Sequence, residues 1–168
     1  TSNSGAGAVG LAGANVPEVA TAIGADRRIR DKFLHPGPGY GGSCFPKDVR
    51  ALERTAIQAG YTAELLRAVE AVNNRQKEKP LELLRKHFGD RLKRCHIAIW
   101  GISFKPNTDD LREAPSLTLI ESLLKLGAQV TAHDPEAAAG ARKIFEGRKG
   151  FNVEEDPYIA AAGADALV

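Results

Sequence analysis

The chain has 168 residues, 43% of them hydrophobic and 26% charged, which are ordinary values for a folded globular protein. This composition excludes a mainly disordered chain and a collagen-like fibre. No run approaches the roughly 18 to 20 consecutive apolar residues that cross a bilayer, so we expect no membrane partner. The net charge of +2, from 23 basic and 21 acidic residues, does not favour nucleic acid as a partner.

The cysteine and histidine content argues against a disulfide framework and against a metal centre. Cys44 and Cys95 are too few for a disulfide scaffold, and no stretch has the pattern of a signal peptide. The four histidines lack the spacing of metal ligands, and we expect no metal site. A cytoplasmic protein is the expectation that follows, with Cys95 as an inert core thiol.

The two ends of the sequence carry weak structural signals. Residues 1–14 consist mostly of small side chains without a capping signal, and we expect no helix there. Residues 163–168 read as a turn that enters a buried strand, and two or three residues leave little room for strand pairing. We therefore expect this sequence to be part of a longer polypeptide.

Helical patterns dominate the first half of the chain. A capping box formed by Asn15 and Glu18 predicts a helix that ends at Gly24. Apolar spacing predicts a second helix from near Pro46 to residue 60 and a third from near residue 62 to residue 89. Pro80 should kink or restart this third helix.

The pattern changes near residue 95 to alternating strands and helices. Residues 96–100, 116–126 and 129–133 read as strand, helix and strand, which predicts parallel strands joined by a right-handed crossover. Residues 151–153, 158–162 and 166 onward continue this order, and Trp100 should be a core residue. The expected fold class is α/β: a helical domain at 1–92, then a Rossmann-like parallel-sheet domain at 93–168.

The segment HPGPGYGGSCFP at residues 35–46, which we call the cysteine loop, is the most informative stretch. Its glycines let backbone amides approach a ligand without obstruction by Cβ atoms. Cys44 lies at a predicted helix N-terminus, where the positive end of the helix dipole favours the thiolate. With Asp48 nearby to handle a proton or a water, the pattern indicates covalent catalysis. A glycine-rich connection with a buried structural cysteine is the alternative.

A second loop, residues 101–113, follows the first predicted strand, and we call it the βα loop. Ligands of open α/β sheets bind at the carboxyl ends of strands, and Lys105 and Arg112 are suited to an anion there. Asp134 ends the next strand, at a position from which an acid reaches a ribose hydroxyl. The loop does not match the GxGxxG fingerprint, and ordinary surface charges remain the alternative.

Four segments together give the chain a family resemblance. They are GANVPEVATAIGADRRI (13–29), FLHPGPGYGGSCFPKDVRAL (33–52), AVNNRQK (71–77) and WGISFKPNTDDLREAPS (100–116). On these segments the chain resembles the UDP-glucose/GDP-mannose dehydrogenase family of nucleotide-sugar dehydrogenases from about residue 13 to its end. The family's amino-terminal NAD domain has no counterpart in these residues.

The resemblance implies oxidation of the C6 alcohol of UDP-glucose to UDP-glucuronate, with NAD as cofactor. In this reading Cys44 is the catalytic thiol that carries a thiohemiacetal and then a thioester, and Asp48 assists water. Arg112 matches a residue that meets the NAD phosphates. The residues that match substrate contacts are Arg28, Phe33, Leu34, Tyr40, Gly41 and Lys105. The helix near residues 62–88 matches the one through which such enzymes form homodimers.

Other functions remain open at this stage. GDP-mannose dehydrogenation uses the same cysteine chemistry, although Phe45 directly after Cys44 favours the UDP-glucose branch. A non-catalytic nucleotide-binding or dimerisation module is a second alternative. A cysteine redox protein is a third, and it would need a resolving thiol, for which Cys95 in a predicted buried strand is poorly suited.

Overall fold

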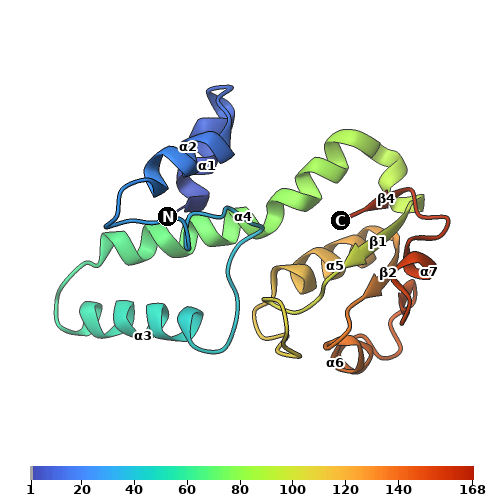
Figure 1. The fold of residues 1–168 in the computed structure, drawn as a ribbon. Helices are drawn as coiled ribbons and strands as arrows, with labels where there is room; N and C mark the ends of the chain where they lie inside the picture. Colours follow the sequence, from blue (N-terminus) through green and yellow to red (C-terminus); the bar gives the residue numbers. More distant parts are fainter. Residues whose placement is uncertain (1) are drawn as a thin grey trace.

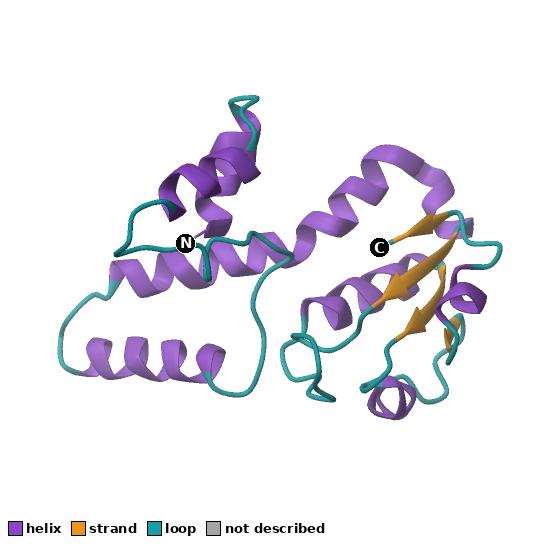
Figure 2. Cartoon of the chain, in the orientation of Figure 1, coloured by secondary structure: helices purple, strands orange, loops and turns teal. Residues whose placement is uncertain are grey.

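The computed structural model of the chain describes residues 2–168; Thr1, which begins the predicted segments 1–14 and 1–92, lies outside the described residues. A helical part comes first and a parallel sheet follows, which confirms the predicted α/β class (Figures 1 and 2). In chain order the elements are α1 (Ser2–Leu11), α2 (Val16–Gly24), α3 (Phe45–Gln58), α4 (Glu64–Phe88), the 3-10 helix η1 (Gly89–Arg94), β1 (His96–Trp100), α5 (Pro115–Leu126), β2 (Gln129–His133), α6 (Ala138–Ile144), β3 (Phe151–Val153), α7 (Pro157–Ala161) and β4 (Ala166–Leu167).

Helix α2 begins at the predicted capping box. The side-chain oxygen of Asn15 accepts a hydrogen bond from the Glu18 backbone N–H at 3.5 Å, and its amide donates to the Glu18 carboxylate at 2.9 Å. The first contact satisfies a backbone N–H that the helix itself leaves unpaired, and the second joins the two side chains. The helix ends at Gly24, as the sequence predicts.

The expectation that residues 1–14 form no helix is wrong, because Ser2–Leu11 form α1. This helix packs against α2 and α4. Ala6 and Val9 line a small hollow together with Val19 and Ile23 of α2. Such tertiary contacts stabilise a helix whose glycines disfavour it on propensity alone.

Helix α4 connects the helical part with the sheet. It runs without interruption through Pro80. Figure 1 shows a bend between its first part, which lies beside α3, and its second part, which lies beside the sheet. Pro80 therefore does not restart the helix, and the bend agrees with the predicted kink, because a proline inside a helix removes one backbone hydrogen bond and crowds the preceding turn. The short η1 after it was not predicted.

The sheet has the strand order β3-β2-β1-β4, and every neighbouring pair is parallel. Strand β1 pairs with β2 along its whole length, from His96 opposite Gln129 to Trp100 opposite His133. Helix α5 joins these two strands, so the predicted strand–helix–strand unit is confirmed. Helix α6, between β2 and β3, was not predicted.

The last residues of the chain pair more fully than the sequence suggests. Ile97 lies opposite Ala166 and Ala98 opposite Leu167, which makes β4 a parallel neighbour of β1. The Val168 N–H donates to the Ala98 carbonyl, and the Val168 carbonyl accepts from Trp100 N–H, both at 2.9 Å. The predicted strand from residue 166 is confirmed, and the expected lack of room for its pairing is wrong, since β1 offers free backbone groups along that edge.

The main core lies between the sheet and helices α4 and α5. Ile97 in β1 and Ile120 and Leu123 in α5 are fully buried, and Leu84 of α4 joins them. Each such side chain contributes about 1.5–3 kcal/mol through removal of apolar surface from water. The prediction that Trp100 is a core residue is wrong: it is 42% exposed, and its indole N–H donates to the Pro157 carbonyl at 3.0 Å.

Cys95 behaves as the sequence predicts. It is buried in the main core, and its thiol donates to the Arg91 carbonyl at 3.4 Å. Burial raises the pKa of this thiol, which disfavours the reactive thiolate.

Across residues 2–168, no helix combines the length and the apolar character needed to cross a bilayer. Nor, in the same range, do three or more His, Cys, Asp or Glu side chains gather as a metal site would require.

Candidate functional site

Cys44 lies at the start of α3, where the sequence places it. It occupies the N-cap position, its side chain is exposed, and it makes no capping hydrogen bond to the helix. Its Sγ lies 3.6 Å from the Ser43 hydroxyl. Asp48 follows one turn later, with its backbone N–H 2.9 Å from the Cys44 carbonyl and its side chain exposed and 3.7 Å from Lys47. An accessible thiol with a carboxylate one helical turn away is an arrangement that covalent catalysis can use.

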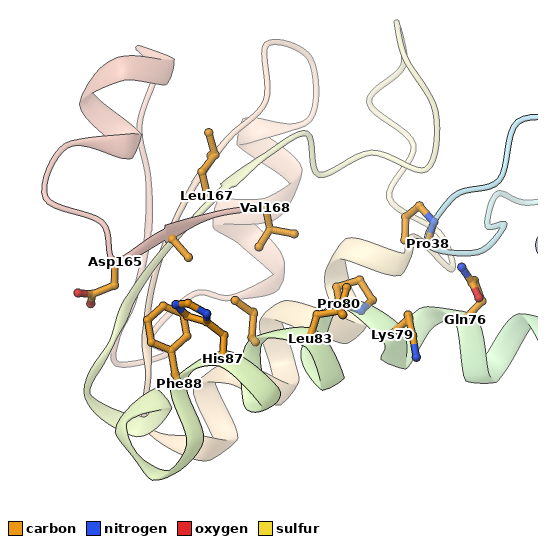
Figure 3. A pocket seen from close by; sticks show the side chains of 12 residues that line it. Pro38, Gln76, Lys79, Pro80, Leu83, His87, Phe88, Asp165, Leu167 and Val168 are labelled. Carbon is orange, nitrogen blue, oxygen red and sulfur yellow. The ribbon is translucent and has the colours of Figure 1, made fainter. Parts of the chain in front are cut away.

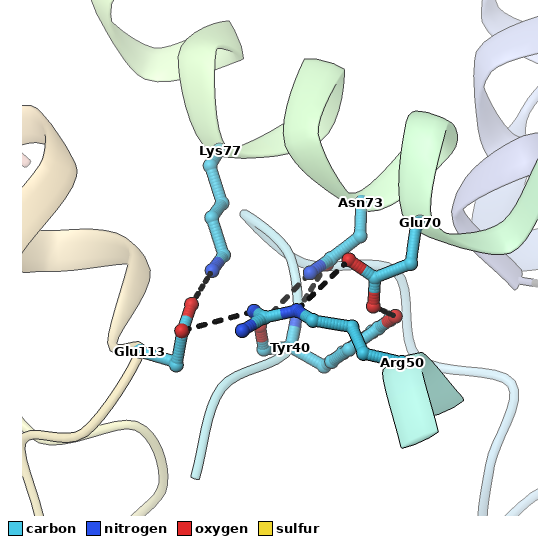
Figure 4. Close-up of polar contacts among 6 residues, drawn as sticks. All are labelled: Tyr40, Arg50, Glu70, Asn73, Lys77 and Glu113. Atoms are coloured by element: carbon cyan, nitrogen blue, oxygen red, sulfur yellow. Dashed lines mark hydrogen bonds and ion pairs between the residues drawn. The ribbon is translucent and has the colours of Figure 1, made fainter. Parts of the chain in front are cut away.

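The cysteine loop is held on α4 by buried polar contacts (Figure 4). Asn73 is only 3% exposed; its Oδ1 accepts from the Tyr40 N–H at 2.7 Å and its Nδ2 donates to the Tyr40 carbonyl at 3.2 Å. The Tyr40 hydroxyl donates to Glu70 at 2.8 Å, and Gln76 donates to the Gly37 carbonyl at 2.9 Å. Burial and the hydrogen bond to Glu70 raise the pKa of Tyr40, so the ring stays neutral.

These α4 residues were not recognised as part of the site from the sequence. Glu70, Asn73 and Lys77 share one face of the helix, since their spacing of three and four residues repeats the helical period. Asn73 and Lys77 are buried, whereas the intervening Asn74 is exposed. The segment AVNNRQK at 71–77, which contributes to the family resemblance, is the sequence signal that could have found Asn73 and Lys77.

The βα loop is anchored by Asp134, which corrects the prediction that this acid reaches a ribose. The side chain is buried, and its carboxylate accepts backbone N–H donors from Ile102 at 2.6 Å and Ser103 at 3.0 Å. Its other oxygen accepts from Glu136 and Ala137. Burial alone would raise the pKa of Asp134, but these four N–H donors outweigh it and the pKa is lowered. Both oxygens of the acid are therefore taken up by backbone donors that shape the loop.

The cysteine loop and the βα loop meet directly. The Gly42 N–H donates to the Arg112 carbonyl at 2.7 Å. A Cβ atom added to Gly41 would overlap the Glu113 backbone, and one added to Gly42, whose φ is +93°, would lie 2.8 Å from the Phe104 ring. Both glycines are thus needed for close approach of the two loops.

Arg112 and Lys105 lie on the exposed side of this junction. Arg112 makes two hydrogen bonds to Asp110, at 2.9 and 2.8 Å, which lowers the pKa of Asp110 to about 2. The same contact raises the pKa of Arg112. The Lys105 ammonium lies 5.2 Å from the centre of the Phe104 ring.

A hollow of about 340 Å³ opens where these parts meet, lined by Gly42, Ser43, Pro46, Lys47, Arg50, Arg112 and Glu113. It brings together the loop that carries Cys44, three cationic side chains and the carboxylate of Glu113, which pairs with Arg50. Such a concentration of cations suits a phosphate-bearing ligand.

None of the six predicted substrate residues lines this hollow, and three of them belong to a different part of the chain. Phe33 is 88% exposed, and Arg28 is an exposed side chain paired with Asp26 at 2.6 Å. Leu34 lies in the hollow that α1 and α2 form. Tyr40 and Gly41, by contrast, belong to the loop that packs on α4 and on the βα loop.

Another groove, of about 600 Å³, lies between the second part of α4 and β4 (Figure 3). Its lining is mainly apolar and includes Pro80, Leu83 and Val168. Pro38 of the cysteine loop and Gln76 of α4 also line it, but none of the predicted catalytic, substrate-binding or cofactor-binding residues does.

One glycine pattern was missed in the sequence. Residues 5–10, GAGAVG, have the spacing GxGxxG. In a dinucleotide site that pattern forms a turn between a strand and a helix. Here the three glycines lie inside α1, with no strand before them in the described chain, and they do not form a phosphate loop.

Comparison with known proteins gives consistent matches along the chain. The model of the UDP-glucose/GDP-mannose dehydrogenase family, central domain, matches residues 2–75, and that of the family's UDP binding domain matches residues 98–168. A Pseudomonas aeruginosa protein named UDP-glucose 6-dehydrogenase is 50% identical over 99% of this chain and 37% of its own length. A Rhizobium meliloti protein of the same name is 47% identical over 93% of this chain and 35% of its own length.

Solved structures agree with these matches. The structure of a UDP-glucose dehydrogenase from Pyrobaculum islandicum superimposes with a TM-score of 0.86 at 34% identity, covering 94% of this chain and 36% of that one. A GDP-mannose dehydrogenase from Pseudomonas aeruginosa gives a TM-score of 0.71 at 30% identity, covering 93% of this chain and 37% of that one. The chain spans little more than a third of the length of the relatives it matches.

Proposed function

Because this chain belongs to the UDP-glucose/GDP-mannose dehydrogenase family, we propose that it contributes the cysteine site of a UDP-glucose 6-dehydrogenase. The full-length enzyme, meaning a polypeptide of the relatives' length that contains these residues, would oxidise the C6 alcohol of UDP-glucose to the carboxylate of UDP-glucuronate. The exposed Cys44 at the start of α3, beside a cationic hollow, is the observation that carries this proposal. Identity of 47–50% to proteins of that name favours UDP-glucose as the substrate.

Cys44 would act at the aldehyde stage. Its thiolate adds to the C6 carbonyl and forms a thiohemiacetal, which becomes a thioester when C6 loses a hydride. Water then attacks the thioester carbonyl, the C–S bond breaks, and the acid and the free thiol are released. Asp48, one turn after Cys44, would assist the attacking water as a base.

NAD, when bound, accepts a hydride at each of the two oxidation stages. Among the described residues Arg112 fits one of its phosphates, because the exposed guanidinium gives Asp110 only its Nε and Nη2 hydrogens and keeps other donors free. The glycines of α1 do not fit the cofactor, since they lie within a helix. In our proposal the remaining NAD contacts belong to the rest of the full-length enzyme.

The sugar nucleotide would be held by residues of both halves. We assign this role to Arg28, Phe33, Leu34, Tyr40, Gly41 and Lys105. The meeting of the cysteine loop with the βα loop supports the roles of Tyr40, Gly41 and Lys105. Exposure of Arg28 and Phe33 is consistent with contacts to a substrate bound by a second subunit or to further parts of the enzyme.

The remaining parts of the proposal concern organisation. Residues 1–92 would form a helical domain that carries the cysteine loop, and residues 93–168 a UDP-binding domain. We propose a cytoplasmic homodimer formed along α4, whose Leu65 and Leu83 are 76% and 58% exposed and leave apolar surface to cover. We propose no role for nucleic acid, membranes or metal ions in this function.

A parallel assay of two substrates tests the proposal. Full-length enzyme is given NAD with either UDP-glucose or GDP-mannose, and NADH is counted per sugar consumed. We expect two NADH per UDP-glucose and a much lower kcat/KM for GDP-mannose. A preference for GDP-mannose would assign the enzyme to the other branch of the family, and no turnover with either sugar would favour a non-catalytic binding module.

A further inference from the structure

Glu113 of the βα loop binds two cations from different helices (Figure 4). Its Oε1 accepts from Arg50 Nη2 of α3 at 2.9 Å, and its Oε2 accepts from Lys77 Nζ of α4 at 3.3 Å. One carboxylate therefore joins α3, α4 and the loop that follows β1. Helix α3 begins directly after Cys44, and α4 carries Asn73, which anchors Tyr40. The loop after β1 carries Arg112.

The ion pairs continue from Arg50 to the cysteine loop. Arg50 Nε lies 3.6 Å from Glu70 Oε2, and Glu70 Oε1 accepts the Tyr40 hydroxyl at 2.8 Å. A continuous polar chain thus runs from Tyr40 through Glu70 and Arg50 to Glu113. Its first member belongs to the cysteine loop and its last directly follows Arg112.

Two members of this network, Lys77 and Glu70, are largely buried, which makes loss of their partners costly. The Lys77 side chain is 9% exposed and that of Glu70 is 16% exposed, whereas Arg50 and Glu113 are 44% and 40% exposed. A buried ammonium without a partner is strongly disfavoured, so Lys77 needs the Glu113 carboxylate. The hydrogen bond from Arg50, followed by that from Lys77, lowers the pKa of Glu113, which keeps the carboxylate charged.

The backbone of Glu113 takes part as well. Its φ is +55°, in the left-handed region that residues other than glycine rarely adopt. This conformation places its backbone against Gly41, next to the hydrogen bond from Gly42 to Arg112. A residue keeps such a backbone only where its surroundings determine it, and the two ion pairs of the side chain do so.

We propose that Glu113 and Arg50 are positioning residues, which fix the cysteine loop against the βα loop so that Cys44 faces a substrate held by the latter. The kinetic test of this inference rests on the proposed function, because it needs turnover of UDP-glucose. The hydrogen-exchange test does not depend on that function. Neither residue has to touch the reacting atoms. Removing the link lets the two loops separate slightly, and a misplacement of about 1 Å costs roughly 100-fold in rate.

The first measurement is hydrogen exchange, which needs no substrate. In the full-length enzyme, Glu113→Gln should accelerate exchange of the Gly42 N–H, which the Arg112 carbonyl protects, by about tenfold or more. Glu121→Gln is the matched control, because Glu121 forms an exposed ion pair with Lys125 at 3.6 Å on α5. Unchanged Gly42 exchange in Glu113→Gln would overturn the proposal.

The second measurement is steady-state kinetics with UDP-glucose. Glu113→Gln and Arg50→Gln should each lower kcat by roughly 10- to 100-fold with a smaller change in KM, and their combination should be little worse than either alone. Arg50→Lys keeps the charge, so its kcat should be higher than that of Arg50→Gln. This comparison of two Arg50 variants tests the proposal even if Glu113→Gln folds poorly. Additive effects, or a loss confined to thermal stability, would contradict a positioning role. A wild-type enzyme that turns over no sugar nucleotide would refute the proposed function and leave the exchange result standing.

Discussion

Replacing Asn73 by alanine tests the anchor that holds the cysteine loop on α4. The side chain is 3% exposed and makes two hydrogen bonds to the backbone of Tyr40, at 2.7 and 3.2 Å. Alanine leaves the Tyr40 N–H and carbonyl without these partners. An unsatisfied buried polar group costs about 1–3 kcal/mol, and Tyr40 is only partly buried, so we take the lower end for each group, about 2 kcal/mol in total.

The expected loss is local, and hydrogen exchange of the cysteine loop measures it. A decrease of about 2 kcal/mol in the free energy of local opening corresponds to an increase of roughly 30-fold in the exchange rate of the Tyr40 N–H. Asn74→Ala is the matched control, because Asn74 is the exposed neighbour on the same helix. If Asn73→Ala accelerates exchange no more than Asn74→Ala, the anchor described here does not hold the loop.

Three further predictions concern the βα loop and its contacts. Gly41→Ala should destabilise the enzyme by about 1–3 kcal/mol, because the added methyl group meets the Glu113 backbone. Gly37→Ala is the control and should be tolerated, since no atom lies within 4 Å of the added methyl group. Equal melting temperatures of the two variants would contradict this packing. The pKa of Asp110 is lowered from 3.8 to about 2, so its pairing stabilises the fold above pH 3.8, and this contribution is lost as the pH falls toward 2. The difference in melting temperature between wild type and Asp110→Asn should therefore shrink over that range, and a constant difference would argue against the assignment. Lys105→Ala should raise the KM for UDP-glucose, and unchanged KM and kcat would remove Lys105 from the site.

The features that the sequence predicted well are those that local signals determine. The capping box of Asn15 and Glu18, the helix start after Cys44 and the strand–helix–strand order around α5 all depend on neighbours close in the chain. The cysteine loop and the βα loop were also identified separately. Only the fold shows that they touch, through Gly42 and Arg112.

The features that the sequence did not predict depend on distant partners. Helix α1 forms against α2 and α4 despite its weak helix propensity. Trp100 is 42% exposed because it is the last residue of β1, at the edge of the core. Asp134 has the position of a ligand-binding acid, yet four backbone N–H groups occupy its carboxylate. The role of Asn73 appears only once the cysteine loop lies on α4.

The measurement that tests the central claim most directly is the NADH yield of the Cys44→Ser full-length enzyme with UDP-glucose. Serine keeps the size of the side chain and removes the thiol that carries the thioester. The account predicts two NADH and one UDP-glucuronate per UDP-glucose from wild type, and no net formation of the acid by Cys44→Ser. A variant that still releases two NADH per sugar would show that Cys44 is not the covalent nucleophile.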